Sequence, residues 1–180
     1  MRYLFLPILF FMICFTSCKE AKTTPPVEVA TPEVAITTTT YYLIRHAEKD
    51  RSDPENRNPS LKEEGIARAQ QWSEVFKDVT FDMVYSTNYA RTQETATPTA
   101  KRKGLEIKSY DPRTPFDATF EKETLGKTVL VVGHSNTTPM FTNAILKEEQ
   151  FAQIDDTNNG NLYIVTVTGD ERSAQLLHVD

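Results

Sequence analysis

Hydrophobic and polar positions after residue 40 follow two different periods along the chain. Short runs rich in Val, Ile, Leu and aromatic residues have the pattern of β-strands, and longer polar segments between them keep apolar residues on one helical face. Strands are predicted at 41–44, 81–85, 105–110, 128–132, 162–167 and 174–179.

Three helices are predicted between these strands. Ser60 and Glu63 have the spacing of a capping box at the start of the first helix. Asn88 is expected to cap the second helix, in which Pro98 predicts a kink or an interruption. The third helix follows Asn136.

The order of the elements predicts the fold class. The run 128–132 is apolar on both faces, which is typical of a strand in the middle of a parallel sheet covered by helices. The last two strands follow one another closely and are expected to pair in antiparallel fashion. We therefore predict a three-layer α/β/α sandwich with a mostly parallel central sheet and an antiparallel edge near the C-terminus.

The N-terminus has a pattern of its own. Residues 4–15 are almost wholly apolar, a run too short to span a bilayer as a helix and typical of the core of a secretion signal. The run ends at Thr16-Ser17-Cys18, which resembles the lipobox of bacterial lipoproteins. The resemblance implies a signal peptide over 1–18 that ends at a lipidated Cys18. The alternative is an ordinary cleaved signal with an incidental cysteine.

Composition separates a linker from one folded domain. Residues 19–40 are rich in Thr, Pro, Val, Glu and Ala and contain no glycine, which predicts a tether, and 41–180 are long enough for a single domain. We expect an exported lipoprotein that is anchored through its lipid to a membrane, on the periplasmic face or at the cell surface.

Charge and cysteine content narrow the partners. A net charge of −5 argues against a nucleic-acid binder, which needs a broad basic face. Both cysteines, Cys14 and Cys18, lie within the signal, so the domain has no disulfide and no thiolate metal site. We expect no metal and no cofactor.

Two histidines and two arginines follow the ends of three predicted strands. Arg45 and His46 come directly after the first strand, His134 follows the run 128–132, and Arg91 lies at the start of the helix after 81–85. Because the ligand crevice of an open parallel sheet lies at the carboxyl ends of its strands, these four side chains are expected to face one crevice.

These residue types suit phosphoryl transfer. A neutral imidazole such as that of His46 can attack phosphorus and form a phosphohistidine, which water later hydrolyses. Arg45 and Arg91 would bind phosphate oxygens through their planar guanidinium groups. A protonated His134 would donate to an oxygen in the transition state, and backbone N–H groups after Asn136 would add further donors.

Four motifs together resemble the histidine phosphatase superfamily, the phosphoglycerate mutase-like group. They are RHAEK at 45–49, SLKEEG at 60–65, YS at 85–86 before RTQETA at 91–96, and GHSN at 133–136. The resemblance implies that His46 is the nucleophile and that Arg45, Arg91 and His134 complete the phosphate pocket. Ser135 stands where the phytase-like branch has an aspartate proton donor, which indicates the other branch.

The group that protonates the leaving oxygen is left open. In the mutase-like branch a carboxylate between the arginine helix and the second histidine has this role. Glu48, beside the nucleophile, is an alternative that could instead orient His46, and we favour Glu48 and Asp117. The interval is short and predicts little lid, hence an open site. Its carboxylates are Asp111, Asp117, Glu121 and Glu123.

The sequence therefore predicts a phosphatase of the histidine acid type that hydrolyses a small phosphorylated substrate outside the cytoplasm. A phosphoglycerate mutase or a phosphohistidine phosphatase is the near alternative. A catalytically inactive phosphate- or glycan-binding lipoprotein is the alternative from a different class.

Overall fold

The computed structural model describes residues 37–180. The predicted signal peptide (1–18), its lipidation site Cys18 and most of the predicted tether (19–40) lie outside the described residues. Within 37–180, no helix has both the length and the apolar character needed to cross a membrane.

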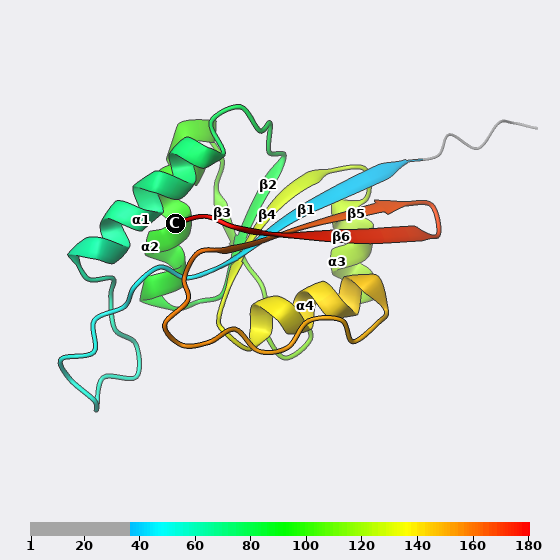
Figure 1. Cartoon of the computed structure of the whole chain (residues 1–180). Coiled ribbons are helices and arrows are strands. Elements are labelled where there is room, and N and C mark those ends of the chain that lie inside the picture. The colour runs from blue at the N-terminus through cyan, green and yellow to red at the C-terminus, as the bar shows by residue number, and fades with distance from the viewer. Residues whose placement is uncertain (1–36) are drawn as a thin grey trace, which may run out of the picture. The chain divides into compact units, whose positions relative to one another are not determined.

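Six strands form one mixed sheet in the order β3-β2-β4-β1-β5-β6. The first four strands in that order are parallel, whereas β5 pairs antiparallel with both β1 and β6 (Figure 1). The predicted, mostly parallel sheet with an antiparallel edge is confirmed. The strands are β1 (Thr38–Arg45), β2 (Met83–Ser86), β3 (Ile107–Ser109), β4 (Thr128–Gly133), β5 (Asn161–Thr168) and β6 (Glu171–His178).

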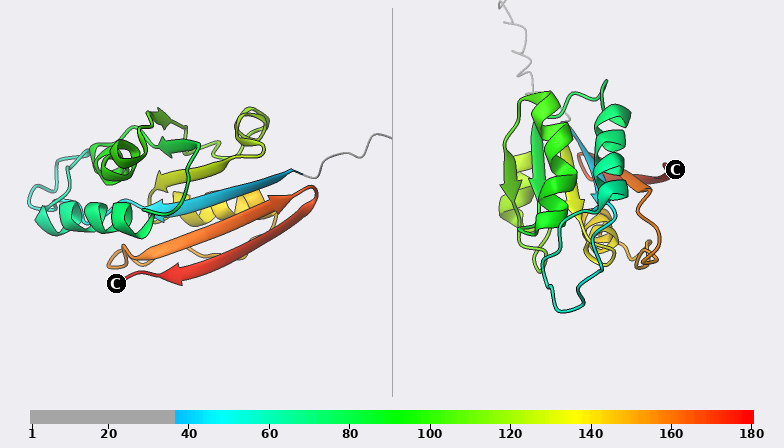
Figure 2. Two further views of the ribbon diagram at one scale, coloured as in Figure 1. Left: turned by 90° about the horizontal axis from the view of Figure 1, so that it is seen from above. Right: turned by 90° about the vertical axis from the view of Figure 1, so that its left-hand side faces the viewer.

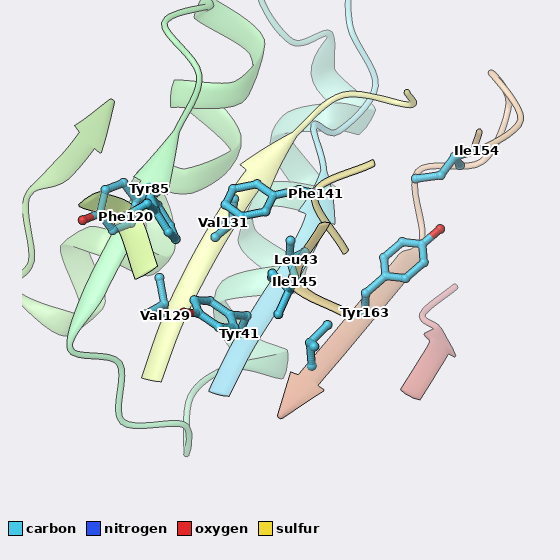
Figure 3. Close-up of a cluster of buried hydrophobic side chains, with 11 residues drawn as sticks. Tyr41, Leu43, Tyr85, Phe120, Val129, Val131, Phe141, Ile145, Ile154 and Tyr163 are labelled. Carbon is cyan, nitrogen blue, oxygen red and sulfur yellow. The ribbon is translucent and has the colours of Figure 1, made fainter. Parts of the chain in front are cut away.

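Helices cover both faces of this sheet, and each face has its own hydrophobic core. Side chains alternate along β1, so Leu43 belongs to one core and the next residue, Ile44, to the other. The first core includes Phe120 and Phe141 from α3 and α4 (Figure 3), and the second includes Trp72 from α1. Figure 2 shows α1 and α2 side by side. The helices are α1 (Glu63–Val75), α2 (Ala90–Lys103), α3 (Ala118–Thr124) and α4 (Thr137–Leu146).

The predicted capping box at the start of α1 is wrong. The helix begins at Glu63, and Lys62 occupies the N-cap position without a side-chain cap. Ser60 is held instead by a segment that follows β1, because its backbone oxygen accepts from the Asp50 N–H at 2.8 Å. Long-range pairing with that segment therefore overrides the local capping pattern.

The predicted cap of α2 is also wrong, and the helix is not interrupted at Pro98. Its cap comes from another part of the chain, since the Asn58 Oδ1 accepts from the Ala90 N–H at 2.8 Å, and Asn88 does not cap the helix. Pro98 lies inside α2, which continues from Ala90 to Lys103. A proline removes only one backbone donor, and packing of Ala96 and Ala100 in the second core keeps the helix continuous.

Candidate active site

Three chain segments meet where β1, β2 and β4 end. In the register of β1 and β4, Arg45 lies opposite Gly133, and the next N–H, that of His46, donates to the Gly133 oxygen at 2.9 Å. A cavity of about 580 Å³ opens at this edge of the sheet. The four side chains that the sequence placed in one crevice all line it: Arg45, His46, Arg91 and His134.

His46 is held by three hydrogen bonds and is neutral. Besides the bond to Gly133, its backbone oxygen accepts from the Asn159 side chain at 2.8 Å. Its Nδ1 lies 2.7 Å from the Ala47 oxygen, and because a carbonyl only accepts, Nδ1 carries the proton. Burial, and then the nearby charges of Arg45 and Arg91, lower the pKa of His46 to about 3. The unprotonated Nε2 is therefore free to act as a nucleophile.

His134 is the second imidazole of the site, partly buried, with its ring centroid 5.5 Å from that of His46. Burial, followed by the charges of Arg91 and Arg45, lowers its pKa to about 4. The ring is therefore neutral in this structure, whereas the sequence-based prediction of a protonated His134 concerns the transition state. An anion bound in the cavity would offset these cations and favour the protonated form.

A chain of hydroxyl groups sets the tautomer of His134. Arg91 Nη2 lies 3.3 Å from its Nδ1, and a guanidinium only donates, so Nδ1 is the acceptor. Nε2–H then donates to Thr87 Oγ1 at 2.8 Å, and Thr87 can donate to Thr92 Oγ1 at 2.9 Å. Thr92 in turn donates to the backbone oxygens of Thr87 and Tyr89, each at 2.9 Å. This chain leaves Nδ1 directed toward Arg91.

Arg91 carries N–H groups that are ready for an acceptor. Its guanidinium carbon lies 4.5 Å from the centroid of the Tyr89 ring, a cation–π contact that holds the group in place. Its Nε and Nη1 are buried and have no hydrogen-bond partner among the described residues. Buried donors without acceptors are costly, and an anion in the cavity would satisfy them.

Arg45 is held more tightly than the sequence suggests. Its Nη1 donates to the backbone oxygens of Asp155 and Asn158 at 2.8 and 2.9 Å, and its Nη2 forms an ion pair with Asp156 at 2.7 Å. Only Nε is buried without a partner within the described chain. Arg45 therefore has a fixed orientation and retains one donor for a ligand.

The carboxylates considered as general acids are dispersed. Asp117 caps α3 by accepting from the Phe120 N–H at 2.8 Å, and Glu48 accepts from Arg68 Nε at 2.7 Å. None of the five candidates lines the main cavity. The remaining three form ion pairs: Asp111 with Arg113, Glu121 with Arg172, and Glu123 with Lys108.

A second cavity, of about 440 Å³, adjoins the first on the other side of His46. Glu48 lines this second cavity, and one of its oxygens, Oε2, is buried without a hydrogen-bond partner in the described part of the chain. Lys49 and Asp156 line both cavities. The nucleophile therefore lies between two hollows that share one cation and one carboxylate.

Several residues of the site escaped the sequence analysis. Thr87, Tyr89, Asp156 and Asn159 support the four predicted side chains. Thr87 and Tyr89 lie between two of the recognised motifs, so their proximity to Arg91 was a usable signal. Asp156 and Asn159 belong to a polar segment before β5 whose sequence gives no indication that it folds back onto β1.

Comparisons with known proteins concern the family and the fold. Residues 41–112 match the model of the histidine phosphatase superfamily, branch 1. No curated protein matches the sequence.

Among solved structures, a mycobacterial glucosyl-3-phosphoglycerate phosphatase is 13% identical to this chain, with a TM-score of 0.61. The alignment covers 80% of this chain and 100% of the phosphatase chain. A phosphoglycerate mutase from Bacillus anthracis is 14% identical with a TM-score of 0.61, covering 79% and 93%. A candidate phosphohistidine phosphatase, SixA, from Agrobacterium tumefaciens is 20% identical with a TM-score of 0.60, covering 79% and 99%. These similarities establish the fold.

Proposed function

We propose that this chain is a phosphatase of the histidine phosphatase superfamily that hydrolyses phosphomonoesters through a phosphohistidine intermediate; the family match over residues 41–112 and the fold support the proposal. One observation carries the proposal. The unprotonated Nε2 of His46 shares a cavity with Arg91 and Arg45, and three of their buried donors, Arg91 Nε, Arg91 Nη1 and Arg45 Nε, have no acceptor among residues 37–180. A phosphoryl group supplies acceptors for these donors beside the nucleophile.

The reaction has two steps in this site. His46 Nε2 attacks phosphorus, the bond to the leaving oxygen breaks, and the electron pair stays on that oxygen. Arg91 and Arg45 donate to the equatorial oxygens, and His134 takes up a proton and donates from Nδ1 once the anion offsets the surrounding cations. Water then attacks the phosphohistidine, which releases inorganic phosphate and restores His46.

The test uses the purified full-length chain with p-nitrophenyl phosphate. His46→Ala should lose at least about 10³-fold in kcat/KM, because the nucleophile acts as part of a unit. His178→Ala is the matched control, since His178 is exposed on the edge strand β6 and should leave the rate unchanged. Acid-labile phosphate should be trapped on wild type and not on His46→Ala. Equal rates for wild type and His46→Ala would refute the proposal, and phosphate binding without turnover would favour the inactive binding lipoprotein.

A second candidate is a phosphohistidine phosphatase. The observation that favours it is the dispersal of the candidate carboxylates, since none of them lines the main cavity. Imidazole is a weaker base than an alkoxide and leaves phosphorus with less help from an acid. A phosphohistidine peptide hydrolysed at least about tenfold faster than p-nitrophenyl phosphate would select this candidate.

Export and membrane attachment form a separate proposal. The apolar run and the sequence Thr16-Ser17-Cys18 support a lipoprotein signal, with residues 19–40 as a tether. Labelled palmitate should attach to the wild-type chain in cells and be absent from Cys18→Ala. Attachment that persists in Cys18→Ala would contradict the lipid anchor.

A further inference from the structure

The leaving oxygen of a phosphomonoester needs a proton, and the carboxylates near His46 are not arranged to provide it. Asp156 is the carboxylate that lines both cavities, and its two oxygens form ion pairs with Arg45 and Arg51, each at 2.7 Å. Hydrogen bonds from these arginines lower the pKa of Asp156. Glu48 accepts from Arg68 and lines only the second cavity.

Lys49 is the cationic side chain that lines both cavities. It follows the nucleophile, His46, by three residues. Lys49 lies after the end of β1, and an isolated β-bridge with Leu61 holds its backbone. Glu48, the residue before Lys49, packs closely against Gly65 of α1, because a Cβ added to Gly65 would lie 2.1 Å from the Glu48 backbone oxygen. The backbone that carries the Lys49 side chain is therefore held in place.

No carboxylate in the described part of the chain contacts the ammonium of Lys49, although the charge of Asp156 acts on it across the cavities. Within residues 37–180 Lys49 forms neither an ion pair nor a side-chain hydrogen bond, whereas Lys62, the other lysine at the second cavity, is paired with Glu64. Burial, followed by the positive charges of Arg51 and Arg91, lowers the pKa of Lys49. An ammonium in such surroundings gives up a proton more readily than one in water.

We propose that Lys49 is the general acid of this site. The proposal rests on the phosphatase function above and identifies the group that completes its chemistry. As His46 attacks and the P–O bond breaks, Lys49 transfers a proton from its ammonium to the leaving oxygen, which departs as the alcohol. The neutral amine then takes a proton from bulk solvent and the ammonium is restored, while water hydrolyses the phosphohistidine without help from Lys49.

The role predicts a dependence on the leaving group. p-Nitrophenolate is a stable anion that needs little protonation, whereas phenolate is a stronger base. Lys49→Met keeps the length of the side chain and removes the proton. It should lower kcat about 10²-fold or more on phenyl phosphate and less than about threefold on p-nitrophenyl phosphate. Lys49→Arg should not restore the rate on phenyl phosphate, because a guanidinium keeps its proton.

Two further variants separate this role from its rivals. Lys62→Met, which removes the paired lysine of the same cavity, should match wild type on both substrates. Glu48→Gln should affect the two substrates equally, since Glu48 here only supports the backbone and Arg68. A loss confined to phenyl phosphate in Glu48→Gln would assign the proton to Glu48 and overturn the proposal.

Other outcomes are equally decisive. Equal losses on both substrates in Lys49→Met, or rescue by Lys49→Arg, would make Lys49 an electrostatic contact to the phosphate. A wild type that hydrolyses p-nitrophenyl phosphate but not phenyl phosphate lacks a general acid, which overturns this inference while the phosphatase function stands. A wild type inactive on both, with no phosphate on His46, would refute the phosphatase function itself.

Discussion

Replacing Thr87 tests whether the hydroxyl chain controls His134. Thr87 is fully buried, and its Oγ1 is the acceptor for His134 Nε2–H at 2.8 Å. Thr87→Val keeps the shape of the side chain and removes that acceptor. Thr92 keeps two backbone oxygens as acceptors, so the loss falls on His134. A buried donor left without a partner costs about 1–3 kcal/mol of unfolding free energy.

The same change should also slow the reaction. Without an acceptor at Nε2, the ring of His134 turns or adopts the other tautomer, and Nδ1 no longer has a fixed role. We expect kcat/KM on p-nitrophenyl phosphate to fall about 10- to 100-fold in Thr87→Val. Thr87→Ser keeps the hydroxyl and should stay within about threefold of wild type, while losing about 1 kcal/mol for the missing methyl group.

Thr99 provides a matched control on α2. It is also buried, but its Oγ1 has no hydrogen-bond partner in the described region. Thr99→Val should therefore leave the free energy of unfolding unchanged or raise it. Urea denaturation gives the stabilities, and ¹⁵N NMR of the His134 ring reports its tautomer. If Thr87→Val costs no more than Thr99→Val and the ring signals of His134 do not move, the reasoning is refuted.

Three more predictions follow from burial and packing. The pKa values of His46 and His134 lie near 3 and 4, below the ordinary 6.5, so the unfolded chain binds more protons than the folded one between these values. The free energy of unfolding should therefore be highest above about pH 6.5 and fall as the pH is lowered toward 4. The fall should be less steep in His134→Asn, and an equal slope would contradict the pKa shifts. Gly65→Ala, whose Cβ would meet the Glu48 oxygen at 2.1 Å, should cost at least about 2 kcal/mol in urea denaturation and lower activity, whereas unchanged activity would show that the backbone beside His46 tolerates movement. Phe141→Ala, at a fully buried position in the first core, should cost about 3–5 kcal/mol, and a cost below about 1 kcal/mol would mean that the core collapses around the site.

Local patterns predicted the sheet well because strand periodicity is a local property. The apolar runs at 41–44 and 128–132 became the adjacent central strands β1 and β4, and the pair after residue 160 became the antiparallel edge. Helix starts were predicted less well. Ser60 before α1 pairs with Asp50, and the first N–H of α2 donates to Asn58; no local rule finds such partners from other segments.

The sequence by itself determined which residues meet. His46 and His134 each follow a strand that had to lie in the sheet, and the carboxyl ends of parallel strands share one edge, so their convergence with Arg45 and Arg91 was a consequence of topology.

The tertiary structure alone decided how these side chains are charged and held. Proton position and pKa depend on burial and on neighbours such as Thr87 and Asp156, which folding brings in from other segments. The dispersal of the carboxylates and the placement of Lys49 between two cavities are decided in the same way, since a cavity is bounded by several distant segments at once.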